Sequence, residues 1–105
     1  MIFIDDDALV IKFPGLHPNA GVRIDLQRTL RLPDDGKDHP LPPGLGSFPL
    51  RHIEDYDLSE NNDLKSRGGV IMPMFQADAL WLNFDPIMDD YDSVEYPLAI
   101  KIGTG

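Results

Sequence analysis

The sequence predicts a small, mostly β domain: a compact antiparallel sandwich or a partly open barrel with at most one short helix. Apolar residues make up 42% of the 105 residues, which is enough for a packed core. Ten prolines and nine glycines divide the chain into short segments and disfavour long helices. One segment, Val22–Leu32, alternates between apolar and polar residues, as a half-buried strand does. An α+β fold with one short helix is the alternative.

The N-terminal residues predict two short strands, Ile2–Ile4 and Ala8–Phe13. Asp5-Asp6-Asp7 forms either a turn between them or a bulge within one long strand, and the sequence does not decide between these. Pro14-Gly15 and Gly21 then mark a loop.

The strand Val22–Leu32 has the strongest pattern in the chain. Its two parities separate into an apolar set and a polar set, which predicts one buried face. The apolar set is Val22, Ile24, Leu26, Leu30 and Leu32, and the polar set is Arg23, Asp25, Gln27, Thr29 and Arg31.

The middle of the chain predicts little regular structure. Pro33-Asp34-Asp35-Gly36 is a turn sequence, and the prolines that follow it favour extended backbone. A short strand or an extended segment is expected over Phe48–Ile53, and one or two helical turns within Leu58–Lys65.

Three further strands are predicted towards the C-terminus. Val70–Phe75 and Ala79–Phe84 read as two arms of a hairpin, joined by Gln76-Ala77-Asp78. Pro73 lacks an N–H donor and is therefore expected at an edge or a bulge. The last strand, Tyr96–Ile102, places Leu98, Ile100 and Ile102 on one face.

The net charge of −9 bears on partners and location. An acidic surface repels phosphate backbones and anionic membranes, so neither nucleic acid nor a membrane is an expected partner. The chain has no cysteine, which excludes disulfides and thiolate metal ligands. Residues 1–7 lack the pattern of a signal peptide, so a cytoplasmic location is expected.

The length predicts a single domain over residues 1–105. Its glycine-rich end, Gly103-Thr104-Gly105, is typical of a frayed terminus, and a cut through a longer protein is the alternative.

Arg28 occupies the apolar parity of the Val22–Leu32 strand, between Leu26 and Leu30. A buried guanidinium must be paired, because an unpaired buried charge is very costly. Arg28 is therefore turned outwards by a bulge, held in a structural ion pair, or placed as a clamp for an anionic ligand such as a carboxylate or phosphate.

The arm around Trp81 is apolar on both faces: Leu80, Leu82 and Phe84 alternate with it. Such a strand is either central and covered twice, or exposes one face as an interface with a partner or a second copy. Leu80, Trp81, Leu82 and Phe84 are the predicted interface residues.

The remaining chemical signals are weak. The acidic loop 85–95 is a weak candidate for divalent-metal binding, although its spacing is not that of a helix–loop–helix calcium site. His17, His39 and His52 show no zinc-binding spacing. No nucleophile elbow, phosphate-binding loop or dinucleotide fingerprint is present, which favours a non-enzyme, and no cofactor is predicted. Acid–base catalysis by Asp or Glu stays open, because it depends on the environment of the carboxyl group and not on a motif.

Three segments carry a resemblance to a family of uncharacterised bacterial proteins: Arg28–Gly36 (RTLRLPDDG), Pro40–Gly46 (PLPPGLG) and Pro73–Leu82, which ends in ALWL. The resemblance covers about Arg28 to Ile102. It implies a bacterial origin and supplies no activity.

The expected function is a non-enzymatic cytoplasmic domain for protein interaction or self-assembly, with a homo-oligomer or another protein as partner. The alternatives are a binder or enzyme for a small anionic ligand at Arg28, and divalent-metal binding by the 85–95 loop.

Overall fold

The N-terminal hairpin is the first element of the sheet. The structure, a computed structural model, describes residues 1–56, 62–88 and 94–104. Strand β1 (Ile2–Asp5) pairs antiparallel with β2 (Ala8–Lys12). The two residues between them have positive φ, 48° at Asp6 and 57° at Asp7, as a two-residue hairpin turn requires. Of the two alternatives that the sequence leaves open for Asp5-Asp6-Asp7, the structure has the turn, at Asp6 and Asp7.

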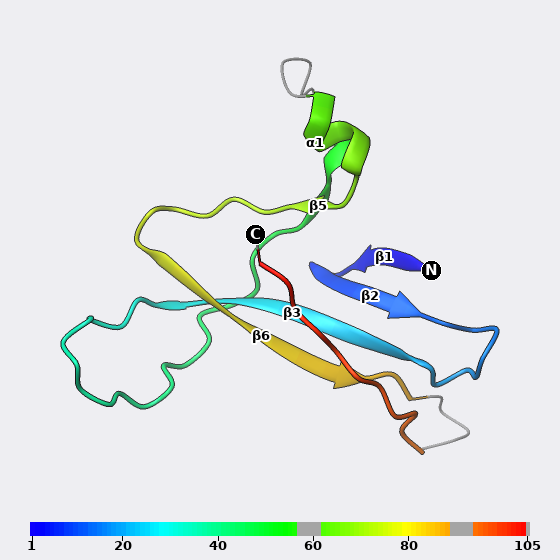
Figure 1. Cartoon of the computed structure of the whole chain (residues 1–105), viewed down its shortest axis with the longest axis horizontal. Coiled ribbons are helices and arrows are strands. Elements are labelled where there is room, and N and C mark those ends of the chain that lie inside the picture. The colour runs from blue at the N-terminus through cyan, green and yellow to red at the C-terminus, as the bar shows by residue number, and fades with distance from the viewer. Residues whose placement is uncertain (57–61, 89–93, 105) are drawn as a thin grey trace.

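The main sheet has four antiparallel strands in the order β1-β2-β3-β6 (Figure 1). Strand β3 (Gly21–Leu30) pairs with β2 through its first half and with β6 (Asp78–Pro86) along almost its whole length. A two-stranded sheet, β4 (Arg51–His52) with β5 (Val70–Ile71), lies beside a 3-10 turn (Ile53–Asp55) and the helix α1 (Asn62–Arg67). The predicted mostly β antiparallel fold with one short α-helix is confirmed for the described residues, and the sheet does not close into a barrel.

The hairpin predicted between Val70–Phe75 and Ala79–Phe84 is wrong. The first strand ends at Ile71 and pairs with β4, whereas β6 pairs with β3. Pro73 removes a ladder donor two residues after Ile71, which favours the early end of β5. The predicted Phe48–Ile53 strand is reduced to Arg51–His52, and the helix predicted over Leu58–Lys65 is Asn62–Arg67 in the described residues.

The strand predicted at Tyr96–Ile102 is also wrong: no residue of this segment is in a strand. The segment instead runs across the sheet near Val22 and Phe84 (Figure 1). Its alternating apolar residues remain exposed, Leu98 by 40%, Ile100 by 47% and Ile102 by 58%, so the alternation does not mark a buried strand face. Pro97 moreover has no N–H to donate.

The strand register places most of the large apolar side chains on one side of the four-stranded sheet. Residues directly opposite each other in an antiparallel sheet point to the same face. This apolar face consists of Ile2, Ile4, Leu9, Ile11, Val22, Ile24, Leu26, Leu80, Leu82 and Phe84. Of these residues only Val22 is buried, and Ile2, Leu80 and Phe84 are exposed.

The two largest apolar side chains that are fully buried lie where the chain returns to β3 after the proline-rich loop, residues 33–46. The Phe48 backbone N–H donates to the Leu26 carbonyl (2.8 Å), and the Arg28 N–H donates to the Gly46 carbonyl (2.9 Å). Residues 46–48 therefore lie along the second half of β3, at the same edge that β2 occupies along the first half. Phe48 and Leu50 are fully buried there.

Gly21, the first residue of β3, allows close approach of β2. A Cβ at this position would lie 2.6 Å from the Ile11 carbonyl oxygen. Because that contact is with backbone, we expect Gly21→Ala to lower the free energy of unfolding by about 1–3 kcal/mol in urea denaturation. Gly15→Ala is the matched control, since nothing lies within 4 Å of its Cβ. Equal effects of the two changes would contradict this account.

Candidate interaction site on strand β6

Strand β6 carries all four of the predicted interface residues, on two different faces. Leu80, Leu82 and Phe84 point to the apolar face, opposite Arg28, Leu26 and Ile24 of β3. Leu80 and Phe84 are each 37% exposed. Trp81 points to the other face, opposite Gln27. The structure therefore brings three of the four residues together and separates Trp81 from them.

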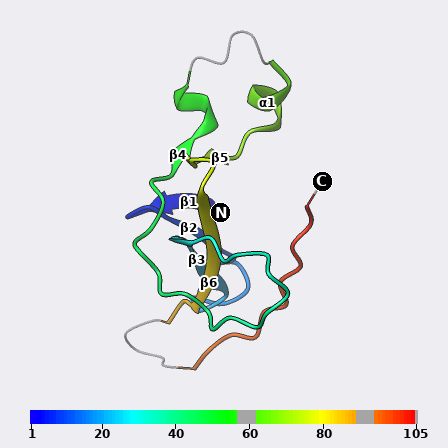
Figure 2. The same cartoon turned by 90° about the vertical axis from the view of Figure 1, so that its left-hand side faces the viewer.

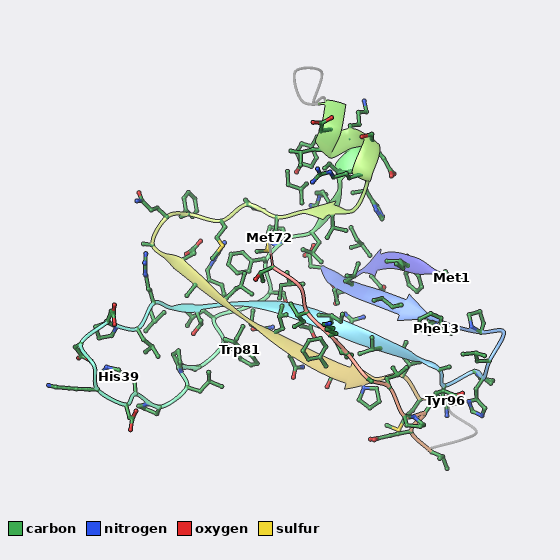
Figure 3. The ribbon with its side chains drawn as sticks, viewed as in Figure 1. Met1, Phe13, His39, Met72, Trp81 and Tyr96 are labelled. Carbon is green, nitrogen blue, oxygen red and sulfur yellow. The ribbon has the colours of Figure 1, made fainter. Side chains whose placement is uncertain are left out.

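Trp81 is partly covered by the proline-rich loop. A Cβ added at Gly44 would lie 3.1 Å from Trp81 Cζ2 and 2.6 Å from Gln27 Oε1, so only glycine leaves room for the indole. The Trp81 Nε1 is buried without a hydrogen-bond partner in the structure. Figure 3 labels Trp81 beside β6 and β3. The Trp81 indole therefore packs against Gly44 of the proline-rich loop.

Arg28 stays on the apolar face, because the register of β3 contains no bulge at this position. Its Nε lies 3.5 Å from Asp78 Oδ2, and its guanidinium lies 4.7 Å from the centre of the Phe48 ring. The side chain is 36% exposed. The structural ion pair considered from the sequence is present, whereas an anionic ligand at Arg28 stays a prediction.

A groove of about 400 Å³ lies at the C-terminal end of β6. Most of the residues that line it are apolar, and Asp85 and Glu95 are the two acidic ones. The Tyr96 ring, which lines it, stacks on His17 at 5.6 Å between centroids (Figure 3). The groove is lined by Val22, Phe84, Asp85, Pro86, Glu95, Tyr96, Pro97, Leu98 and Ile100. Sequence reasoning missed it because it expected residues 96–102 inside a sheet.

The proposed metal loop 85–95 falls partly outside the described residues, since 89–93 are not described. Within the described ranges, no group of three or more histidine or acidic residues is placed to hold a metal ion. The acidic turn Asp5–Asp7 instead makes structural contacts: Asp7 Oδ1 accepts from the Leu50 backbone N–H (3.1 Å), and Asp5 pairs with Arg23 (3.0 Å).

The pKa of the Asp35 carboxyl is lowered by its hydrogen bonds. Asp35 Oδ1 lies 2.9 Å from His39 Nε2 and accepts from the Lys37 backbone N–H at 3.0 Å. The His39 hydrogen bond, followed by that of Lys37, holds the pKa of Asp35 below its ordinary value. These contacts stabilise the turn that begins the exposed proline-rich loop, where Figure 3 labels His39.

Comparison with protein-family models, with curated proteins and with solved structures finds no match to this chain. The resemblance noted from the sequence therefore stays a prediction. Within the described residues, none of the helices has the length and apolar character required to cross a bilayer.

Proposed function

We propose that this chain is a non-enzymatic cytoplasmic domain for protein interaction, and that its partner is a second copy of the same chain. The observation that carries the proposal is the exposure of large apolar side chains on the apolar face. Leu80 and Phe84 are each 37% exposed and Ile2 is 65% exposed, although the register directs all three to the face that should form a core. Large apolar side chains exposed on one face of a sheet are typical of interaction sites.

The size of the exposed surface supports the same conclusion. The chain exposes 8087 Å², whereas a folded monomer of 11.8 kDa exposes roughly 5,900 Å². The difference of roughly 2,200 Å² exceeds the ~800 Å² that each partner buries in a standard protein–protein interface. The radius of gyration, 16.5 Å, is also larger than the ~13 Å of a globular domain of this length. Association with a second copy would bury part of this surplus.

Light scattering over a range of protein concentrations tests the proposal. We expect the mass to rise from 11.8 kDa towards twice that value as concentration increases. Leu80→Asp should shift the equilibrium towards the monomer by on the order of tenfold in Kd, because it places a charge in the apolar contact.

Leu41→Asp is the matched control: it makes the same change at a residue that is 74% exposed in the proline-rich loop, away from the sheet. It should leave the equilibrium unchanged. A mass of 11.8 kDa at every concentration, or an equal effect of both substitutions, would contradict the proposed function.

A further inference from the structure

Strand β6 leaves a long backbone edge without a partner among the described residues. It is the last strand in the order β1-β2-β3-β6 and spans nine residues, Asp78–Pro86 (Figure 2). Within the described ranges, the backbone bonds outside the ladder give β6 only a turn contact, from the Asp78 N–H to the Phe75 carbonyl. Long apolar edge strands are templates for pairing with another chain.

The direction of the β6 backbone groups follows from the hydrogen bonds of β3. The Leu26 carbonyl and the Arg28 N–H bond to the 46–48 segment, and therefore point away from β6. The backbone N–H and C=O groups of alternate residues point to opposite edges of a strand. The backbone groups of Gln27, between Leu26 and Arg28, therefore point to β6 and bond to those of Trp81.

The alternate residues of β6 consequently face outwards. Leu80, Leu82 and Phe84 lie opposite Arg28, Leu26 and Ile24, so their N–H and C=O groups point to the open edge. These three residues supply three unpaired donors and three unpaired acceptors, whereas the N–H of Asp78, the outward-facing position before them, bonds to the Phe75 carbonyl. Pro86, the next outward-facing position, has no N–H to leave unpaired.

This edge is complementary to itself. If a second copy is laid antiparallel with a two-fold axis at Leu82, then Leu82 faces Leu82 of the second copy and Leu80 faces its Phe84. All three donors and all three acceptors then find partners. If the second copy is shifted by one residue, the outward-facing N–H and C=O groups of one strand lie opposite residues whose groups point away from them. If it is shifted further, a residue at the end of the edge is left without a bonding partner.

The side chains agree with the same register. Opposite residues of the two copies point to one face, so the apolar faces become continuous. Near the ends of the strand, Asp78 of one copy faces Pro86 of the other, and Asp85 of one copy faces Ala79 of the other. No two carboxylates therefore lie opposite each other. The repulsion that remains is that of two chains of net charge −9, which salt screens.

We propose that two copies of this chain pair edge to edge through β6, antiparallel about a two-fold axis at Leu82, and form one continuous eight-stranded sheet. The inference rests on the proposed function, self-association, and names the surface and register that perform it. Closed two-fold dimers with one self-complementary patch are the commonest homo-oligomers.

Disulfide trapping tests the register, because the chain has no cysteine of its own. Ala79 of one copy and Asp85 of the other form a non-hydrogen-bonded pair with Cα atoms ~4.5 Å apart, within disulfide range. Ala79→Cys and Asp85→Cys variants, mixed and mildly oxidised, should give a mixed disulfide dimer in high yield. Each variant alone should give little, because identical positions are ~20 Å apart.

Ala79→Cys mixed with Asn83→Cys is the control, since that pair requires a shifted register. Selective trapping of the 79–85 pair supports the proposal. Equal trapping of both pairs, or of neither, overturns it. If light scattering still shows a dimer in that case, the proposed function stands and another surface performs it; if the chain is a monomer at all concentrations, the proposed function fails as well.

Discussion

Phe48→Ala is expected to lower the free energy of unfolding by about 3–5 kcal/mol, which is a large part of the stability of a small domain. Phe48 is fully buried, its ring contacts the Arg28 guanidinium, and its backbone joins the proline-rich segment to β3. Truncation leaves a cavity and removes the ring on which the guanidinium rests. Urea denaturation at fixed protein concentration measures the change.

Phe75→Ala is the control for this prediction, because Phe75 is 73% exposed. Its effect on the free energy of unfolding should be within about 0.5 kcal/mol. A Phe48→Ala protein as stable as the Phe75→Ala protein would show that the proline-rich segment does not form part of the core.

Leu82→Lys and Leu82→Glu are each expected to weaken the dimer by on the order of tenfold in Kd. Leu82 lies on the proposed two-fold axis, so either substitution places two like charges directly opposite each other. Mixing the two variants should restore association as a heterodimer, since Lys then faces Glu. Native mass spectrometry distinguishes the heterodimer from the two homodimers.

The neighbouring position supplies the control for this exchange. Asn83 faces Trp81 of the second copy in the proposed register, so Asn83→Lys and Asn83→Glu create no direct like-charge pair. Mixing them should give no gain over either variant alone. If the mixed Leu82 variants also show no gain, at low salt where charge effects are strongest, the axis does not pass through Leu82.

The local structure could be predicted where one segment contains its own signal. The alternation of Val22–Leu32 predicted β3, and Ala79–Phe84 predicted the inner part of β6. The partner of β6 could not be predicted, because β3 lies about fifty residues earlier and many apolar strands offer similar faces. The sequence therefore favours the nearest strand-like segment, Val70–Phe75, as the partner of β6, and this prediction is wrong.

The C-terminal segment shows the limit of reading alternation as a strand. Leu98, Ile100 and Ile102 alternate as a strand does, yet alternation records only that one side of an extended chain is apolar. Whether the backbone joins a sheet depends on whether an unpaired strand edge lies within reach. The local sequence pattern does not show this. Here the segment lies over the sheet near Val22 and Phe84 instead.

The candidate site was predicted in part. The apolar character of Leu80, Leu82 and Phe84 was visible in the sequence, and so was the unusual position of Arg28. The separation of Trp81 onto the other face follows from strand geometry alone. The unpaired edge was missed, because the sequence of a strand does not show whether another strand covers its edge.

Amide hydrogen exchange of β6, followed by NMR at several protein concentrations, tests edge pairing most directly. The inward-facing N–H groups of Trp81 and Asn83 bond to β3 and should be protected at every concentration. The outward-facing N–H groups of Leu80, Leu82 and Phe84 should exchange rapidly in dilute protein and become protected as the dimer forms. If these three amides exchange at the same rapid rate when light scattering shows a dimer, the chain does not associate through this edge.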